Sequence, residues 1–379
     1  MDFELSDGQQ MTQECAREFA EKRLIPSAGE FDEKGEFPRE IVSEMADLGL
    51  MGITVPEEWD GGGMDTQAYA IAVEEISRGC ASVGVMLSAH TSLACAPLLK
   101  YGSDDQKEKY LKPLASGKKL GALAMTEPGA GSDLGSVKLT ARKDGEEYVL
   151  DGTKIFITNG GTADTVVVLG STDPGAGSRG LSMFIVEKDT PGFTIGKVED
   201  KLGIRASNTA ELVFQECRIP AANLLGDEGL GFKIGLGTLD GGRIGIAAQA
   251  VGIGRAALEK AVAYSKDREQ FGKAIGSFQA IQWMLADSAT ELDAARLLYL
   301  RAAQLKDKGA RFSSEAAMAK LFASEAASRA ADHAIQIHGG YGFTTEYDPE
   351  RHYRDARITR IYEGTSEVMR MVIAGGLLR

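Results

Sequence analysis

One glutamate near the carboxyl end of the chain stands where a carboxylate could do chemistry. Glu363 lies in the segment I-Y-E-G-T-S-E, between an aromatic ring and a glycine. Thr365 or Ser366 is placed to cap a helix that starts directly afterwards. One interpretation is therefore an ordinary acid favoured by the helix dipole, and the other is a catalytic carboxylate. The spacing alone leaves both open.

Two glycine-rich stretches could hold a ligand close to the backbone. Residues 126–133 read T-E-P-G-A-G-S-D, and residues 337–342 read I-H-G-G-Y-G. Small residues let backbone N–H groups approach a phosphate or a planar ring. Taken alone, the first stretch is only a turn, and the second is equally well a glycine cap at the end of a helix.

Other common motifs are missing or out of context. The sequence has no G-x-x-x-x-G-K-[ST], H-E-x-x-H or G-x-S-x-G. A G-x-G-x-x-A at residues 252–257 lies inside a helical pattern with no preceding strand, which favours close helix packing over dinucleotide binding. The four cysteines form no C-x-x-C pair and the four histidines form no ligand pattern with them, so we expect no metal site and buried free thiols.

The elements that must position these residues fall into three stretches. Helical spacing predicts helices in the first third, with capping boxes at Ser6-x-x-Gln9 and Ser103-x-x-Gln106, a proline-started helix after Pro38 that stops at Gly49, and a helix over Thr66–Arg78. From about Gly121, short alternating runs and turn dipeptides predict strands. These lie at Tyr148–Leu150, Ile155–Thr158, Thr165–Leu169, Ser182–Val186 and Glu211–Phe214, with turns at Asp144-Gly145, Asp151-Gly152, Asn159-Gly160 and Pro191-Gly192.

After about Gly226 the pattern returns to helix. Alanine-rich segments with apolar residues three and four apart are Gly237–Ser265, Gln279–Lys306, Ser314–Gly339 and Ser366–Leu377. The fold class predicted is α+β: an N-terminal helical domain (1–120), a middle antiparallel β-sandwich or barrel (121–225) and a C-terminal four-helix bundle (226–379).

Composition limits the partners. The 379 residues carry 55 acidic and 42 basic side chains, a net charge of -13, which disfavours nucleic acid and anionic membranes. An anionic ligand therefore needs its own local cations. The N-terminus M-D-F-E-L-S-D-G-Q-Q has neither a basic leader nor an apolar core, and apolar runs such as residues 166–169 are too short to span a bilayer, so we expect no membrane insertion and a cytoplasmic protein.

The order and wording of six segments resembles the acyl-CoA dehydrogenase family along essentially the whole chain. These segments are A-M-T-E-P-G-A-G-S-D, K-I-F-I-T-N-G, L-D-G-G-R, D-R-x-Q-F-G-K, Q-I-H-G-G-Y-G and I-Y-E-G-T-S-E. Within the family, the chain is most similar to bacterial short-chain, butyryl-CoA-type enzymes. The resemblance implies the three domains predicted above, a homotetramer, bound FAD, and transfer of electrons to an electron-transferring flavoprotein.

The resemblance also implies a reaction and a base. A carboxylate removes the α proton of an acyl-CoA thioester while the β hydrogen leaves as hydride to the flavin, giving the trans-2-enoyl-CoA. The base of the Y-E-G-T motif is Glu363 here. Some relatives place it on the L-D-x-x-R helix, but those positions are Gly241 and Gly242 in this chain. Such a base needs desolvation and a raised pKa, together with donors for the developing enolate.

Contacts are implied residue by residue. Expected FAD contacts are Met125, Thr126, Ser132, Phe156, Thr158, Arg268, Phe271, Gln279, Gln336, Gly339, Gly340, Thr365 and Glu367, those from Arg268 to Gly340 reaching across a subunit interface. Expected substrate contacts are Ser132, Asp240, Arg243, Tyr362 and Gly364. Arg243 is otherwise a helix ion pair with Asp240, and Phe156 is otherwise β core.

Three alternatives stay open. The chain could be a dehydrogenase for a branched, dicarboxylic or cyclic acyl-CoA. It could be an acyl-CoA oxidase, although oxidases of this superfamily usually carry a further C-terminal domain. The long bundle helices also allow a helical scaffold without chemistry, which would purify without flavin.

Overall fold

The computed structural model describes residues 4–378, and the chain alternates helix, sheet and helix as the periodicity predicts. The N-terminal helices are α1 (Asp7–Phe19), α2 (Ala28–Lys34), α3 (Arg39–Asp47), α4 (Thr66–Gly79), α5 (Ala81–Ser88), α6 (Ala96–Tyr101), α7 (Asp104–Gln106) and α8 (Lys112–Ala115). Both predicted capping boxes form, at Ser6 and at Ser103, and the left-handed Gly49 follows α3.

The stretch Ala81–Tyr101, from α5 to α6, is by length and composition apolar enough to cross a membrane. Most of it is buried inside the fold. It packs against α9, the central helix of the bundle, and against strand β1, so its apolar character is explained by the core.

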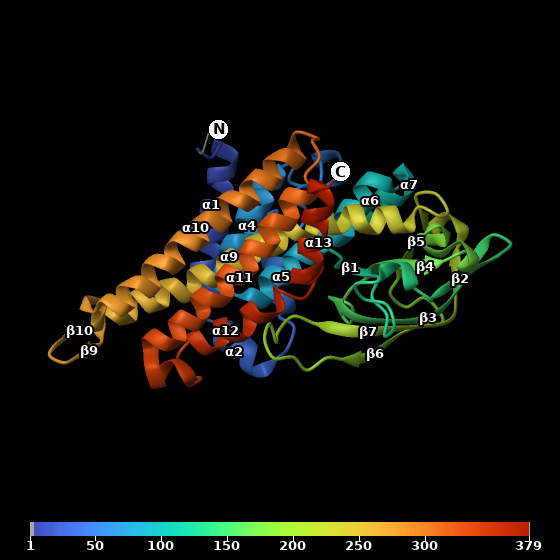
Figure 1. Cartoon of the computed structure of the whole chain (residues 1–379). Coiled ribbons are helices and arrows are strands. Elements are labelled where there is room, and N and C mark those ends of the chain that lie inside the picture. The colour runs from blue at the N-terminus through green and yellow to red at the C-terminus, as the bar shows by residue number, and fades with distance from the viewer. Residues whose placement is uncertain (1–3, 379) are drawn as a thin grey trace.

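The middle of the chain forms one eight-stranded sheet in the order β6-β7-β3-β2-β4-β5-β8, with β1 added beside β4. The strands are β1 (Gly121–Ala124), β2 (Thr140–Asp144), β3 (Glu147–Thr158), β4 (Thr165–Ser171), β5 (Leu181–Glu187), β6 (Phe193–Val198), β7 (Thr209–Pro220) and β8 (Leu224–Leu225). The sheet is folded over, with β3, β6 and β7 below β1, β4 and β5 in Figure 1. Residues of both layers share one core, as in a sandwich.

Two local predictions in this region are wrong. Pairing is not antiparallel throughout: β1 lies parallel to β4, and β2 touches β4 in parallel, because β1 ends in a long loop instead of a hairpin. Asp151-Gly152 is not a turn between two strands. Residues 147–158 form one strand, and Gly152, at φ 147°, is a bulge where a Cβ would lie 2.9 Å from the Cα of Leu139.

The C-terminal part consists of long helices. They are α9 (Gly231–Asp267), α10 (Gln279–Asp307), α11 (Ser313–His338), α12 (Pro349–Ile358) and α13 (Ser366–Leu377), with the short hairpin β9 (Glu269–Gln270) and β10 (Lys273–Ala274) after α9. In Figure 1, α9 runs from the sheet to this hairpin at the opposite end of the molecule. The G-x-G-x-x-A lies within α9, where Gly254 is packed against Leu292, as expected for close helix packing.

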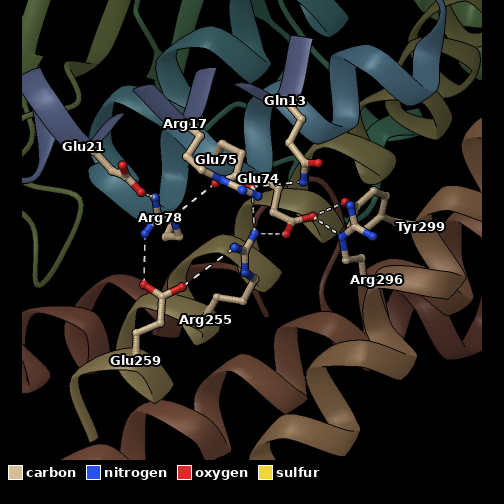
Figure 2. A network of polar contacts seen from close by, with 10 residues as sticks. All are labelled: Gln13, Arg17, Glu21, Glu74, Glu75, Arg78, Arg255, Glu259, Arg296 and Tyr299. Atoms are coloured by element: carbon tan, nitrogen blue, oxygen red, sulfur yellow. Dashed lines mark hydrogen bonds and ion pairs between the residues drawn. The ribbon is translucent and has the colours of Figure 1, made fainter. Parts of the chain in front are cut away.

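A buried ionic network joins the N-terminal helices to the bundle (Figure 2). Glu74 and Glu75 of α4 are fully buried, and Arg255 of α9 reaches both carboxylates, 3.1 Å from Glu75 Oε1. Burial opposes ionisation of Glu75, but the hydrogen bond from Arg17 and the charge of Arg255 lower its pKa to about 2. The other members are Gln13, Glu21, Arg78, Glu259, Arg296 and Tyr299.

Candidate active site

Glu363 lies in a strained turn between α12 and α13. Its φ is 53° and that of Gly364 is 103°, so two consecutive residues adopt backbone conformations that side chains disfavour. Glycine is favoured at 364 because of this positive φ, and a Cβ there would also displace the flexible end of Met369, whose Cε would lie 2.6 Å away. Thr365 then starts α13 as the N-cap, accepting a hydrogen bond from Val368 N at 3.3 Å. The cap predicted from the sequence forms, and the turn aims Glu363 inward.

The Glu363 side chain is half-buried, and one oxygen of its carboxylate is buried without a bond. Its Oε2 atom is inaccessible to solvent and has no hydrogen-bond partner among the described residues. Burial raises the pKa of Glu363 to about 7, although the charges of Lys320 and Arg243 act in the opposite direction. A desolvated carboxylate that titrates near neutrality, with one oxygen free, can accept a proton from a bound molecule.

Arg243 of α9 is bonded to the backbone of this turn. Its Nε donates to the Glu363 carbonyl at 3.3 Å, and its Nη1 donates to Asp240 Oδ1 at 2.6 Å. Ser313 donates to the other Asp240 oxygen at 2.5 Å. Arg243 therefore forms the predicted ion pair with Asp240 and also holds the turn that carries Glu363, and its contact with substrate stays a prediction.

Two glycines of α9 are placed differently around Glu363. At Gly242 a Cβ would lie 2.9 Å from the Glu363 carboxyl carbon and 2.8 Å from Leu93 Cδ2, so the carboxyl group occupies the space a side chain would need. At Gly241 a Cβ would only touch Lys306 Nζ, at 3.4 Å. The absence of a side chain at 242 is thus a condition for this position of the carboxylate.

Hydroxyl groups close the interior beyond the base. Tyr362 donates to the Oε1 of Gln249, and Tyr69 and Ser88 share a hydrogen bond of 3.0 Å between their hydroxyl oxygens. Both hydroxyls lie where a Cβ on Gly245 would be, one turn of α9 after Gly242. The face of α9 one turn beyond Gly242 is therefore covered by hydrogen-bonded polar side chains.

The loop 126–133 is anchored by a buried ion pair. Lys154 of β3 is fully buried, and its Nζ lies 2.8 Å from Glu127 Oε1 and 2.9 Å from the Met125 carbonyl. The Glu127 carboxylate also accepts hydrogen bonds from the backbone N–H groups of Lys138 and Leu139, at 2.7 and 2.9 Å. This pair ties the start of the loop to residues 138 and 139, just before β2.

The loop itself is open on its outer side. Gly129 and Gly131 have no atom within 4 Å of an added Cβ, and Ser132 is exposed. Met125, at the start of the loop, packs on α9, with its Sδ 2.9 Å from where a Cβ on Gly235 would be. Gly235 precedes Gly242 by seven residues, about 10 Å along the helix. The loop and Glu363 are therefore neighbours along one face of α9.

Phe156 is presented outward beside this loop. Its φ is 58° and its side chain is 60% exposed, at a register shift of β3 between Lys154 and Ile157. Phe156 is therefore not part of the β core. The backbone of the neighbouring Ile155 donates to the Thr126 carbonyl at 2.9 Å, and half-buried Thr158 follows two residues later. A bulge that turns a large ring into solvent is typical of a ligand surface.

The remaining predicted contacts gather at the far end of the bundle. Arg268 stacks over the Tyr341 ring at 5.8 Å, and Phe271 is 93% exposed at φ 52°. Exposed residues nearby along the chain are Gln279, Gln336, Gly339 and Gly340. Gly339 ends α11 as its cap. In Figure 1 this end, marked by β9 and β10, is opposite the sheet domain, so one chain does not bring this group to Phe156.

Thr365 and Glu367 stay near the base instead. Thr365 is partly engaged as the cap of α13, and Glu367 is exposed in the first turn of that helix. A hydrogen bond from its own backbone N–H and one from Thr365 lower the pKa of Glu367.

Some contributors to this site were not predicted. Lys320 stands in the alanine stripe of α11, and Lys154 stands in a buried strand position. A lysine in the buried register of an otherwise apolar element is the signal that could have identified both, because burying a lone charge is costly. Tyr69 and Gln249 gave no such signal, since their roles depend on contacts between distant helices.

Known proteins resemble this chain over its whole length. Models of the acyl-CoA dehydrogenase N-terminal, middle and C-terminal domains match residues 6–118, 122–217 and 229–378. The chain is 54% identical to the short-chain specific acyl-CoA dehydrogenase of Rattus norvegicus mitochondria over 376 residues, 99% of this chain and 91% of the relative. The protein therefore belongs to the acyl-CoA dehydrogenase family and is an oxidoreductase.

Two solved structures are similar throughout. Butyryl-CoA dehydrogenase from Megasphaera elsdenii is 50% identical, with a TM-score of 0.99 and full coverage of both chains. A chain solved in work on the electron-transferring flavoprotein of Acidaminococcus fermentans and flavin-based electron bifurcation is 51% identical, also with a TM-score of 0.99 and full coverage of both chains.

Proposed function

We propose that this protein oxidises short-chain acyl-CoA thioesters such as butyryl-CoA to the trans-2-enoyl-CoA, with Glu363 as the base. The observation that carries the proposal is the buried Oε2 of Glu363, which has no partner among the described residues. A proton acceptor must be ionised to act, and the pKa of Glu363 is raised to about 7. Activity is therefore expected to rise with pH through neutrality.

The chain's own groups bind and orient the substrate. The α C–H bond breaks, its proton moves to Glu363, and the electron pair forms the new α,β double bond as the β hydrogen leaves as hydride. Arg243 holds the Glu363 carbonyl and is paired with Asp240, which fixes the direction of the carboxylate. The turn residues Tyr362 and Gly364 would line the path of the thioester.

FAD is the cofactor that the residues fit. The loop at Gly129 and Gly131 leaves room for a group to approach the backbone, and Phe156 projects from its bulge beside that loop. Met125, Thr126, Ser132 and Thr158 would hold the flavin half, and Thr365 and Glu367 the adenosine half. When bound, the flavin supplies the hydride acceptor.

A second copy of the chain is needed to complete that cofactor site. The FAD contacts expected from a second subunit are Arg268, Phe271, Gln279, Gln336, Gly339 and Gly340. The hairpin of β9 and β10, which adjoins Arg268 and contains Phe271 at its tip, lies at the end of the molecule opposite the sheet domain (Figure 1), and Phe271 is almost fully exposed. We propose a homotetramer in which this end of one subunit meets the flavin side of another. The guanidinium of Arg268 would supply local positive charge for a pyrophosphate in an acidic protein.

A short acyl chain is favoured by the closed interior. The Tyr69 and Ser88 hydroxyls fill the space at Gly245, one helical turn from Gly242. A longer acyl chain would have to displace these side chains and break the hydrogen bond between them. The electron acceptor we propose is an electron-transferring flavoprotein, and the compartment is the cytoplasm.

The base assignment is tested with Glu363→Gln. The variant should keep the yellow flavin spectrum and lose reduction by butyryl-CoA in the absence of oxygen. Glu30→Gln, at an exposed glutamate of α2 that pairs with Lys34, is the matched control and should behave like the wild type. Retained reduction in Glu363→Gln would remove Glu363 as the base. Rapid hydrogen peroxide formation in air would identify an oxidase instead.

A further inference from the structure

Lys320 is a fully buried lysine in the alanine-lined face of α11. Its neighbours one turn away on that helix, Ala316 and Ala323, are also completely buried. Its Nζ donates a hydrogen bond of 2.6 Å to the carbonyl of Gly364, the residue after the base. Among the described residues Lys320 forms no salt bridge. A charged group with this burial and no carboxylate in contact requires another explanation.

The strained turn is held by cationic side chains at two successive carbonyls. Arg243 Nε donates to the Glu363 carbonyl at 3.3 Å, and Lys320 donates to the Gly364 carbonyl. Glu363 and Gly364, whose carbonyls are held, both have positive φ, a conformation that persists only where the surroundings fix it. Of the two bonds, that of Lys320 is the shorter. It ties the turn to α11, and Arg243 ties it to α9.

The charged and titratable groups around Glu363 come from every element packed against it. They are Arg243 with its partner Asp240 from α9, Lys320 from α11, Tyr69 from α4 and Tyr362 from the turn, and Glu367 of α13 acts on Lys320. The charge of Arg243 is shared with Asp240 at 2.6 Å. Lys320 has no such partner among the described residues. The charge of Glu363 is the strongest electrostatic influence on the pKa of Lys320, followed by those of Arg243 and Glu367.

The two buried groups influence each other. Burial lowers the pKa of Lys320 to about 7, and the charge of Glu363 opposes that change. Lys320 is in turn the larger of the two cationic influences that lower the pKa of Glu363 against burial. Without Lys320, only the charge of Arg243 would oppose the rise in the pKa of Glu363 that burial causes.

We propose that Lys320 is a positioning residue for the base: its ammonium fixes the turn through the Gly364 carbonyl and favours the charged form of the Glu363 carboxylate. This inference rests on the proposed role of Glu363. Lys320 itself does not touch the reacting atoms. It determines where the carboxylate stands and at what pH it can accept a proton.

Two variants separate the hydrogen bond from the charge. Lys320→Met removes both, and Lys320→Gln removes the charge but keeps an N–H donor. Lys306→Met is the matched control, because Lys306 is also a bundle lysine whose pKa is lowered by burial, but its Nζ faces Gly241. Each holoenzyme is mixed with butyryl-CoA without oxygen, and the rate of flavin reduction is followed across neutral pH.

The rate of flavin reduction should rise with pH, and both Lys320 variants should raise the pH at which this rate is half-maximal by about one unit or more. An opposite charge nearby changes a carboxyl pKa by that much. Lys320→Gln should be faster than Lys320→Met at high pH, and Lys306→Met should match the wild type. An unmoved midpoint in Lys320→Gln, or an equal change in Lys306→Met, would overturn the inference. If the wild type itself is reduced by no thioester, the proposed function has failed instead.

Discussion

Gly242→Ala is a small change that should disable the base while leaving the fold intact. The added Cβ would lie 2.9 Å from the Glu363 carboxyl carbon and 2.8 Å from Leu93 Cδ2, whereas ordinary contact begins at 3.4 Å. The carboxyl carbon must therefore retreat by about 0.5 Å, the difference between 3.4 and 2.9 Å, and Glu363 Oε2, which lies still closer to the added Cβ, must move further. A misplacement of about 1 Å costs roughly 100-fold in rate, so we expect a loss of about ten- to 100-fold.

The assay is anaerobic flavin reduction by butyryl-CoA at saturating substrate. Gly241→Ala is the matched control, because its Cβ would meet only Lys306 Nζ at 3.4 Å, an ordinary contact. Both changes replace glycine by alanine in the same helix, which by itself stabilises a helix interior by about 0.5–1 kcal/mol. A wild-type rate in Gly242→Ala, or an equal loss in Gly241→Ala, would refute the placement of the carboxylate against α9.

Three further predictions address the flavin loop, the helix network and the remote contacts. Lys154→Met leaves Glu127 buried without its cation, so the free energy of unfolding should fall by about 3–5 kcal/mol, measured by urea titration, while Lys197→Met at the exposed Glu199 pair should change little. Arg255→Met should also lower the free energy of unfolding, because Arg255 pairs with buried Glu74 and Glu75. The folded pKa of Glu75, about 2, is below its ordinary 4.5, so its contribution is present above 4.5 and is lost as pH falls towards 2. The variant should therefore lose stability at neutral pH and unfold at a higher pH on acid titration; an unchanged acid midpoint would contradict the network. Phe271→Ala should lower FAD retention and weaken subunit association, as judged by absorbance and sedimentation, with no effect on the melting of the flavin-free chain. Met11→Ala, also at an exposed side chain, should alter none of these.

The helices were predictable because their signals are local. Capping boxes, Gly49 and the alanine periodicity identified elements such as Gln279–Lys306, which the structure ends only one residue later, at Asp307. The sheet was less predictable. Asp151-Gly152 has the composition of a turn, yet Gly152 is a bulge whose conformation depends on the close approach of Leu139. Parallel pairing of β1 with β4 is set by contacts far apart in sequence.

The same distinction holds for the site. Glu363 and its cap could be found from I-Y-E-G-T-S-E, since the turn and helix start are adjacent in sequence. Their contacts with this turn could not be predicted in the same way, because Lys320 and Arg243 reach it from two separate helices, although the residues themselves stand out in the sequence. The family resemblance had placed Arg268 and Phe271 across a subunit interface from the rest of the FAD contacts, and in the structure the hairpin beside them lies at the end of the molecule opposite the sheet domain.

The most direct test of the central claim is the visible spectrum of the purified protein before and after anaerobic addition of butyryl-CoA, with longer and branched acyl-CoAs in parallel. We predict a flavin band that butyryl-CoA bleaches most strongly. Bleaching only by another thioester would keep the chemistry and change the substrate. A colourless protein that takes up no added FAD, or a flavin band that no acyl-CoA bleaches, would contradict the account.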